Sequence, residues 1–331
     1  MTSRHGTALH TTILLFALTC VISCGSKSAT DVPEARLAEA SATGSASAPA
    51  PSNADAPPSE SAEPGEGNWM QWRGPLGNGV APGANPPVAW SETENVRWKV
   101  PLPGKGHSTP IVFEDRIFLT SALEVGDELE ARFSGRPGSH DNLPVTHRAR
   151  FVVICLQRSD GRMLWETTVH EELPVEGGHV SGSLASASAM TDGEHVFAHF
   201  GSFGLFCLDL DGTVVWKIDL GQMHTKHGHG EGSSPALHGD TIVVNWDHEE
   251  QSFVVALDKK TGKERWLMPR NEVTSWSTPI IVEHGGRAQA IVPGSERMRG
   301  YDLETGEVIW ECGGLANNIC ASPVFHRKSV V

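Results

Sequence analysis

The sequence predicts an all-β fold, specifically a β-propeller of four-stranded blades. Three observations predict it. A glycine is followed four positions later by a tryptophan in four segments, Gly161 to Trp165, Gly212 to Trp216, Gly262 to Trp266 and Gly306 to Trp310. The tryptophans recur at intervals of 51, 50 and 44 residues, which is the period of a propeller blade rather than of a helical solenoid. A hydroxyl residue before proline opens an apolar run in most copies, as in Ser277-Thr278-Pro279-Ile280.

Each repeat reads as four short antiparallel strands. After Ser234-Pro235 come a turn at Gly239-Asp240, strands over 241–245 and 253–257, a turn over 259–262, and a last strand that ends in Trp266. Alternating β-branched residues between Gly and Asp turns are typical of an antiparallel meander.

A small residue stands at the first position of each motif, namely Cys155, Cys207, Ala256 or Gly300. We expect it to leave a flat slot for the indole between neighbouring blades. Burial of one indole in such a slot contributes about 2–4 kcal/mol. Cys155 and Cys207 are therefore interpreted as buried core thiols.

The segment from Ala256 to Trp266 resembles the tryptophan-docking motif of the pyrroloquinoline quinone (PQQ) repeat. This repeat forms the blades of quinoprotein dehydrogenases and of the lipoprotein B-subunit of the β-barrel assembly machinery. The stretch from Tyr301 to Trp310 is similar, whereas the first two copies are degenerate. By this resemblance, Asp258, Thr261, Asp302 and Thr305 join the four glycines and four tryptophans as blade-docking residues. Such motifs specify a fold more strongly than a function.

The ring is expected to be incomplete. Four tryptophan motifs predict four blades, and Ser322-Pro323 begins a fifth. Trp98 lies twelve residues before Pro110, close to the spacing from Trp266 to Pro279. We therefore expect Trp98 to belong to an outer strand of the last blade, in a truncated propeller of about seven or eight blades.

The N-terminus predicts export and a lipid anchor. Residues 1–23 have the basic start and short apolar core of a signal peptide. Val21-Ile22-Ser23-Cys24-Gly25 resembles a bacterial lipobox with Cys24 as the lipidated residue, although an ordinary secretory signal is an alternative. Residues 24–66, rich in Ala, Ser and Pro, are expected to be a disordered tether, which leaves 67–331 as the propeller. The expected location is the cell envelope, on the outer membrane or the periplasmic face of a bacterial membrane.

The charge of the chain excludes one class of partner. With 26 Lys and Arg against 40 Asp and Glu, the formal net charge is −14. Electrostatic binding to nucleic acid requires a basic face, so no nucleic-acid partner is expected.

The cysteines argue against a dehydrogenase. By resemblance, a quinoprotein dehydrogenase requires Ca²⁺ beside PQQ, a catalytic aspartate and commonly a disulfide between adjacent cysteines, and this sequence has no adjacent pair. No catalytic residue is assigned. No cofactor is expected, except PQQ with Ca²⁺ if the chain is a quinoprotein dehydrogenase. Cys312 and Cys320 are eight apart, and the sequence leaves open whether they form a disulfide.

Loops that follow the outer strands are expected to line one face of the central channel. His224, His227 and His229 lie in such a loop and are candidate ligands for Zn²⁺ or Cu²⁺, or simply polar loop residues. Channel-face binding is also predicted for three other loop residues, Trp276, Asn317 and Asn318. The insertion over 123–150 is either a solvated surface loop or a partner-binding or lid element.

The leading hypothesis is a membrane-tethered, non-catalytic propeller that acts as a binding or assembly scaffold in the cell envelope. Its expected partner is an envelope protein or peptide, or a polysaccharide. One alternative is a PQQ-dependent alcohol or sugar dehydrogenase whose catalytic blades are missing from this chain. The other is a carbohydrate-binding propeller.

Overall fold

The structure is a computed structural model and describes residues 67–326 and 328–331. The signal peptide, Cys24 and the tether up to residue 66 lie outside the described residues. Within the described part, no helix has both the length and the apolar character needed to cross a membrane.

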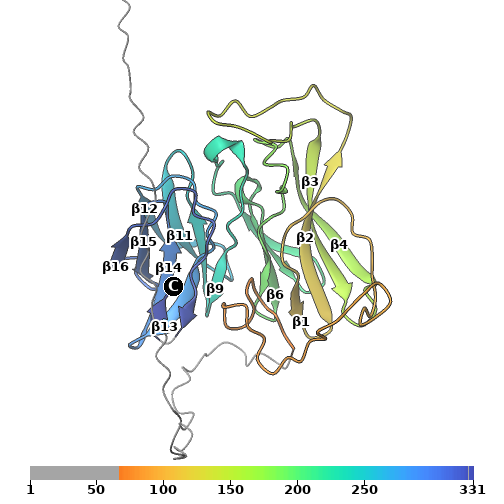
Figure 1. The fold of residues 1–331 in the computed structure, drawn as a ribbon, viewed down its shortest axis with the longest axis horizontal. Coiled ribbons are helices and arrows are strands. Elements are labelled where there is room, and N and C mark those ends of the chain that lie inside the picture. Colours follow the sequence, from red (N-terminus) through yellow and green to blue (C-terminus); the bar gives the residue numbers. More distant parts are fainter. Residues whose placement is uncertain (1–66, 327) are drawn as a thin grey trace, which may run out of the picture. The chain divides into compact units, whose positions relative to one another are not determined.

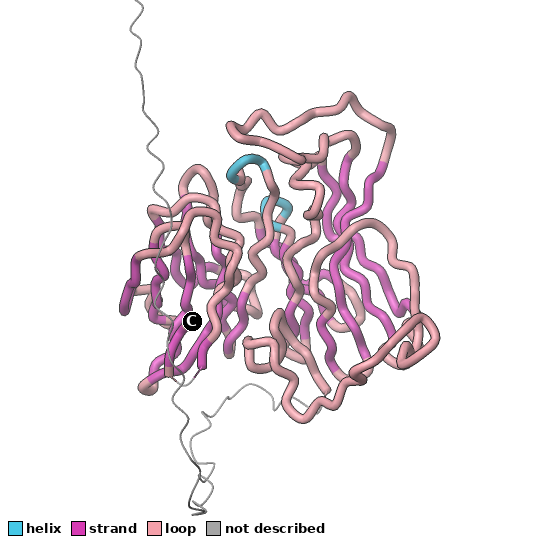
Figure 2. The backbone as a smooth tube through the Cα atoms, in the orientation of Figure 1, coloured by secondary structure: helices cyan, strands magenta, loops and turns pink. Residues whose placement is uncertain are grey.

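Four antiparallel four-stranded sheets follow one another along the chain (Figures 1 and 2). In each sheet the strands pair in sequence order, as predicted for a propeller blade. We number the blades 1 to 4. Their strands are β1 (Ile111–Phe113), β2 (Arg116–Val125), β3 (Arg148–Gln157) and β4 (Met163–Glu172); β5 (Met190–Thr191), β6 (His195–His199), β7 (Leu205–Asp209) and β8 (Val214–Ile218); β9 (Ala236–His238), β10 (Thr241–Trp246), β11 (Ser252–Asp258) and β12 (Glu264–Arg270); β13 (Ile280–His284), β14 (Arg287–Pro293), β15 (Arg297–Asp302) and β16 (Val308–Gly313).

A two-stranded piece follows the fourth blade. Strands β17 (Phe325–His326) and β18 (Ser329–Val330) pair antiparallel after the fifth hydroxyl–proline motif. Two 3₁₀ turns, η1 (Gly201–Phe203) and η2 (Lys226–Gly228), are the only helices among the described residues. The prediction of an all-β propeller-type fold is thus confirmed.

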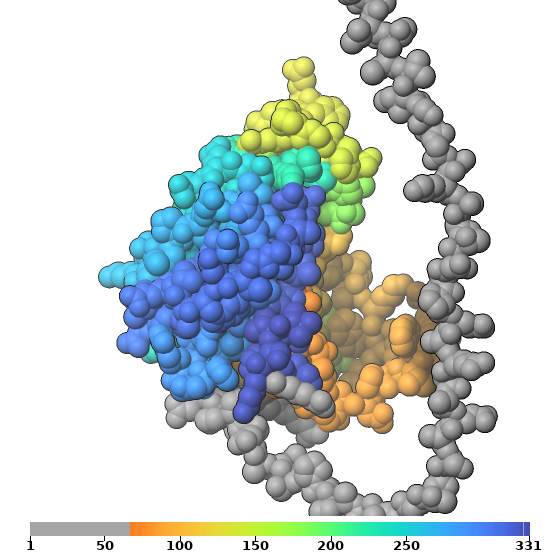
Figure 3. Space-filling view, turned by 60° about the vertical axis from the view of Figure 1, so that its left-hand side comes forward, coloured from red at the N-terminus to blue at the C-terminus, as the bar shows by residue number. Residues whose placement is uncertain are grey.

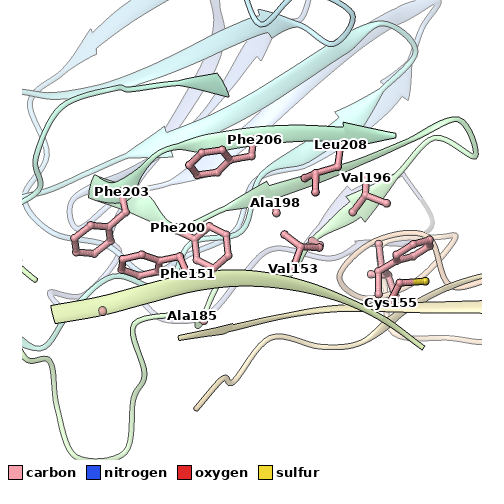
Figure 4. Close-up of a cluster of buried hydrophobic side chains, with 14 residues drawn as sticks. Phe151, Val153, Cys155, Ala185, Val196, Ala198, Phe200, Phe203, Phe206 and Leu208 are labelled. Atoms are coloured by element: carbon pink, nitrogen blue, oxygen red, sulfur yellow. The ribbon is translucent and has the colours of Figure 1, made fainter. Parts of the chain in front are cut away.

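The core lies between neighbouring blades rather than within any one of them. Strand β3 is buried on both faces, so its alternate residues enter two different cores. Phe151 and Val153 pack against Phe200, Phe206 and other residues of blade 2 (Figure 4). In contrast, Val152, Ile154 and Leu156 pack with Trp98 and Val100 of the segment that precedes blade 1. Similar clusters join blade 2 to blade 3 and blade 3 to blade 4.

Trp98 and the outer-strand tryptophans of blades 1 to 3 are each docked on the turn of the blade that follows. The Nε1 of each donates to a backbone carbonyl there, in the pairs Trp98 to Arg158, Trp165 to Leu210, Trp216 to Lys259 and Trp266 to Leu303, at 2.9–3.0 Å. The motif glycine of that turn lies against the ring. A Cβ added to Gly161, Gly212, Gly262 or Gly306 falls 2.5–2.9 Å from the indole of Trp98, Trp165, Trp216 or Trp266, respectively. The glycine is thus required by close packing, and by its positive φ in each turn.

The slot for the indole therefore has two walls. The small residue predicted to form it lies directly across from the tryptophan of its own sheet, as in the register pairs Ala256 with Trp266 and Gly300 with Trp310. The neighbouring blade contributes the other wall, which is the motif glycine. The sequence predicted these glycines as blade-docking residues but did not predict that they contact the indole ring.

The motif aspartates close the turns that carry these glycines. Asp258 Oδ1 accepts from the Thr261 backbone N–H at 3.0 Å and from Thr261 Oγ1 at 2.9 Å. Asp302 makes the same pair of bonds with Thr305. The Arg265 guanidinium beside Asp258 lowers the pKa of that carboxyl, which keeps it an acceptor.

A chain of hydroxyl groups links the first strands of successive blades. The backbone N–H of Thr109, Ser188, Ser234 and Thr278 donates to the hydroxyl of Ser188, Ser234, Thr278 and Ser322, respectively, at 2.8–3.0 Å. The hydroxyl residue before proline in the repeat is therefore the hydrogen-bond acceptor at every blade junction. Ser188, which is followed by Ala189 instead of proline, fills the same role.

The two ends of the repeat array differ from its middle. Trp98 lies outside the assigned strands, yet it docks on Gly161 as the later tryptophans dock on theirs. Its position therefore matches that of an outer-strand tryptophan of a preceding blade. Trp310 donates instead to Gln289 Oε1 of its own blade at 2.8 Å.

Candidate binding face

One end of the blades carries the long loops. Because the strands are antiparallel, the loops that join consecutive blades leave from the same end as the loops between the second and third strands. The long ones are residues 173–189, 219–235, 271–279 and 314–324, and the insertion between β2 and β3. We call this end the loop face. The insertion arches over it toward η2 (Figure 1) and forms a protruding ridge in the space-filling view (Figure 3).

The insertion is shorter than expected and is well anchored. Strands β2 and β3 extend to Val125 and from Arg148, so the loop itself spans 126–147 rather than 123–150. Its two arms pair through reciprocal backbone bonds between Arg132 and Val145. The carbonyl of Asp141 accepts from the backbone N–H of residue 180, and Asn142 Nδ2 donates to the carbonyl of His227 at 2.8 Å. The insertion is therefore anchored on the loop face, while most of its residues, including all of 126–133, are exposed to solvent.

A groove lies between the insertion and the first blade. It has a volume of about 360 Å³. Its lining includes apolar side chains such as Leu123, Leu143 and Leu184. Charged groups, including Lys105 and Arg148, are few among the lining residues. This size and composition are typical of sites that bind organic or peptide ligands.

The structure separates the three candidate histidines. His224 Nδ1 lies 3.9 Å from Glu176 Oε1, and its Nε2 lies 3.7 Å from Glu250 Oε1. His227, which lies within η2, and His229, which follows η2, instead lie beside two histidines from other loops, His140 and His179.

Trp276 is half-buried and its ring nitrogen is already engaged. Its Nε1 donates to the carbonyl of Gly230 at 2.7 Å, and its backbone N–H donates to the carbonyl of Ile319. Asn317 and Asn318 are exposed on the loop that holds Ile319. Trp276 thus connects two loops of the face.

A small cavity of about 40 Å³, lined by both polar and apolar residues, lies beneath the loops. Glu231 is half-buried there, and its two oxygens accept from the backbone N–H and the hydroxyl of Ser202 at 2.7 and 2.5 Å. Burial raises the pKa of Glu231 to about 7. His199 also lines this cavity, and burial lowers its pKa to about 4, so the imidazole is neutral.

A buried ion pair supports the same cavity. Arg270 donates to both oxygens of Asp247 at 2.8 and 3.1 Å, and Ser275 Oγ donates to the second oxygen at 2.8 Å. Both side chains are completely buried. Burial raises the pKa of the Asp247 carboxyl while Arg270 opposes the shift. The bidentate geometry is that of a structural support rather than of an accessible acid.

The four described cysteines are free thiols. Cys155 and Cys207 are buried, and burial raises the pKa of each to about 12, which makes them poor nucleophiles. Cys312 and Cys320 are exposed, and the structure has no disulfide between them.

Sequence reasoning missed His140, His179 and Arg270. His140 lies 89 positions from His229, and no periodicity connects the two. Arg270 ends an outer strand as an isolated basic residue. The only signal available was an arginine at the end of β12 together with an aspartate, Asp247, directly after β10 of the same blade.

Comparison with known proteins identifies the family. The family model described as "Outer membrane protein assembly factor BamB" (PQQ_2) matches residues 149–330. The chain belongs to this family. The PQQ_2 match begins in β3 and covers the remaining strands of blade 1 and all of blades 2 to 4. Among curated proteins, a search finds no match to the chain.

Solved structures similar to this PQQ_2 chain include a BamB protein and two alcohol dehydrogenases. BamB from Moraxella catarrhalis is 14% identical with a TM-score of 0.37, and the alignment covers 63% of this chain and 55% of that one. The quinohemoprotein alcohol dehydrogenase ADHIIG from Pseudomonas putida HK5 is 15% identical with a TM-score of 0.43, covering 67% and 36%. The quinohemoprotein alcohol dehydrogenase from Comamonas testosteroni is 11% identical with a TM-score of 0.38, covering 63% and 39%. The chain thus spans 36–55% of the length of these structures.

Proposed function

We propose that the chain is a non-catalytic binding scaffold of the bacterial cell envelope, that a lipid on Cys24 tethers it to a membrane, and that its loop face binds a protein or peptide. Membership of a family described by an outer-membrane protein assembly factor supports the envelope part of this proposal. The sequence features of residues 1–24 support the tether.

The single observation that carries the binding role is the preformed groove beside the insertion. Its walls are fixed by backbone pairing, since Lys105 and Ala122 exchange both N–H to carbonyl bonds and the backbone N–H of Leu143 donates to the carbonyl of Gly178. A site that is rigid before binding loses little conformational entropy when its partner arrives.

Exposed apolar side chains on the same loops favour a protein partner over a polysaccharide. Leu143 is 40% exposed, Val180 48% and Phe133 64%. Two of the three, Leu143 and Val180, are aliphatic, and aliphatic groups that protrude beside a groove are typical of protein interfaces. Sugars are instead bound by flat, accessible aromatic rings and hydrogen-bonding groups. Phe133 is an exposed ring of this kind, but Trp276, the aromatic residue expected to bind on this face, is half-buried with its ring nitrogen engaged.

Site-specific photocrosslinking in the native host tests the binding surface. A photoreactive residue in place of Leu143 is expected to crosslink to one envelope protein, and a residue at Val308, an exposed position of β16, is the control. The purified partner should then bind at least ten-fold more weakly to Leu143→Asp than to Val308→Asp. Equal affinity of these two variants would overturn the proposal, as would dye-linked oxidation of an alcohol or aldose by the chain after reconstitution with PQQ and Ca²⁺.

The tether is tested separately by Cys24→Ser. This variant should leave the membrane fraction and lose incorporation of a labelled fatty acid, whereas a chain with Cys20→Ser should behave as wild type. Retention of Cys24→Ser in the membrane fraction would contradict the lipid anchor.

A further inference from the structure

Four histidines from three loops converge on the loop face. His140 comes from the insertion, His179 from the loop after β4, and His227 and His229 from the loop after β8. One ligand nitrogen of each of His140, His179 and His229 lies within 4.8 Å of the other two. The ring of His229 is central, at centroid distances of 4.7, 4.9 and 5.3 Å from His140, His179 and His227.

These spacings fit imidazoles around one metal ion. With zinc–nitrogen bonds of about 2.0–2.1 Å in tetrahedral geometry, the ring centroids of two histidine ligands lie roughly 5 Å apart. The rings of His140 and His179 each meet that of His229 at a steep angle, 79° and 62°, rather than stacking on it. Nitrogen atoms can therefore point to a common centre after small side-chain rotations.

The other ring nitrogen of three histidines already faces a hydrogen-bonding group of the protein. His227 Nδ1 lies 2.9 Å from the carbonyl oxygen of Pro137, and His179 Nδ1 lies 2.7 Å from Ser181 Oγ. His140 Nδ1 lies 3.3 Å from a carboxylate oxygen of Asp141. His227 and His140 can donate through Nδ1 to these oxygens and then present the lone pair of Nε2, which is the usual arrangement around bound metals. His179 Nδ1 instead accepts from the backbone N–H of Ser181 at 3.2 Å, so His179 binds a metal through Nε2 only after the proton on Nε2 is released or moved.

His229 supplies an independent sign of a missing ligand. Its Nε2 is buried and has no hydrogen-bond partner in the described structure. A buried polar atom without a partner is costly, and a metal ion at this nitrogen would remove the cost.

The backbone holds the three loops in register. The backbone N–H of His179 donates to the carbonyl of His229 at 3.1 Å, and Asn142 Nδ2 donates to the carbonyls of His227 and Gly228 at 2.8 and 3.0 Å. His227 itself has a positive φ of 58°, a conformation that is costly for a residue with a side chain. The histidines are thus positioned by contacts that do not involve their rings.

From this arrangement we propose that His140, His179 and His229 bind one late first-row transition-metal ion, of which Zn²⁺ is the probe, with His227 as a fourth ligand. Neutral imidazoles suit Zn²⁺ and its neighbours in the series rather than Ca²⁺ or Mg²⁺, which prefer oxygen. The ion would fasten the insertion to the loops that follow blades 1 and 2. This site goes beyond the proposed scaffold function and does not depend on it.

Calorimetric titration of the full chain, without a histidine tag, with Zn²⁺ tests the proposal. We expect one ion per chain, a tetrahedral absorption spectrum when Co²⁺ replaces Zn²⁺, and slower proteolysis of the insertion with metal. His179→Ala and His229→Ala should each weaken binding by at least about 10-fold, since even outer-shell changes cost about 10–100-fold.

Two histidine substitutions outside the cluster serve as controls. His284→Ala removes an exposed histidine of β13, and His195→Ala removes the histidine of the other cluster of potential ligands, with Asp192 and Glu194. Both should bind Zn²⁺ as wild type. Any cluster variant that melts lower than wild type without metal is replaced by its His→Gln counterpart. Unchanged affinity in the cluster variants, or an equal loss in His195→Ala, would overturn the proposal.

Discussion

The contact between a motif glycine and an indole allows a stability test with a matched control. Gly262 has a φ of +69°, and a Cβ added to it falls 2.9 Å from Trp216 Cε3 and 3.1 Å from Cγ2 of Ile218. Gly239, in the β9–β10 turn of the same blade, has a φ of +55°, and a Cβ there meets nothing within 4 Å. Alanine at either position is therefore destabilised by the positive φ of the backbone, but only alanine at 262 also displaces the indole.

The two costs separate as follows. A left-handed conformation costs an alanine about 1–2 kcal/mol, which is the whole effect expected for Gly239→Ala. Forcing an extra methyl into a packed site adds about 1–3 kcal/mol, so Gly262→Ala should lose about 2–5 kcal/mol of the free energy of unfolding. The difference between the two variants, about 1–3 kcal/mol, isolates the docking contact.

Urea unfolding of the full chain, followed by circular dichroism, measures this difference. The midpoint of Gly262→Ala should fall well below that of Gly239→Ala with an unchanged slope. If the two variants unfold within about 0.5 kcal/mol of each other, the neighbouring-blade contact does not limit packing and the reasoning fails.

Three further predictions concern buried polar groups. Ser234→Ala should cost about 1–3 kcal/mol, because the buried backbone N–H of Ser188 loses its acceptor. Asp247→Asn should cost about 3–5 kcal/mol, because Arg270 stays buried without its charged partner. The third concerns His199, whose pKa of about 4 in the folded chain lies below the unfolded value near 6.5. The unfolded chain therefore binds a proton in this range while the folded chain does not, so stability is lost as pH falls from about 6.5 toward 4, by about 2 kcal/mol between pH 7 and pH 5.

Each of these has its own control, measured by urea unfolding. Ser234→Thr should keep near wild-type stability because threonine holds the same position at 109 and 278; a loss as large as that of Ser234→Ala would argue against the acceptor role. Asp247→Leu with Arg270→Met should recover most of what Asp247→Asn loses, and no recovery would mean that packing, not charge, is at stake. For His199→Phe the loss of stability between pH 7 and pH 5 should shrink by about 2 kcal/mol, and an unaltered pH profile would rule out His199 as its source.

The fold could be predicted because it repeats. Strands over 241–245 and 253–257 were placed from turn residues and β-branched residues, and the structure has them as Thr241–Trp246 and Ser252–Asp258. Repetition gives each prediction several independent tests within one sequence. The identity of the surface that receives each indole was not predictable in the same way, because Gly262 and its tryptophan partner, Trp216, come from different repeats.

The arrangement of residues on the loop face was harder to predict from the sequence than the fold was. Its location followed from topology, and the candidates His227 and His229 lie there, but His224 turns toward Glu176 and Glu250 instead. Which loops meet depends on backbone contacts such as that between the N–H of His179 and the carbonyl of His229, which have no signature in side-chain identity. Histidines that are distant in sequence were therefore brought together by contacts that composition and spacing do not encode.

The chain of hydroxyl acceptors has a consequence for how such molecules grow. Every junction uses the same backbone donor and the same side-chain acceptor, in the same direction, from Thr109 to Ser322. A blade duplicated in frame would bring with it a matching donor on one side and a matching acceptor on the other. Gene duplication could therefore add blades while keeping the same hydrogen bond at every junction. The number of blades in such a propeller is then limited by the angle between blades and not by the hydrogen bonds that join them.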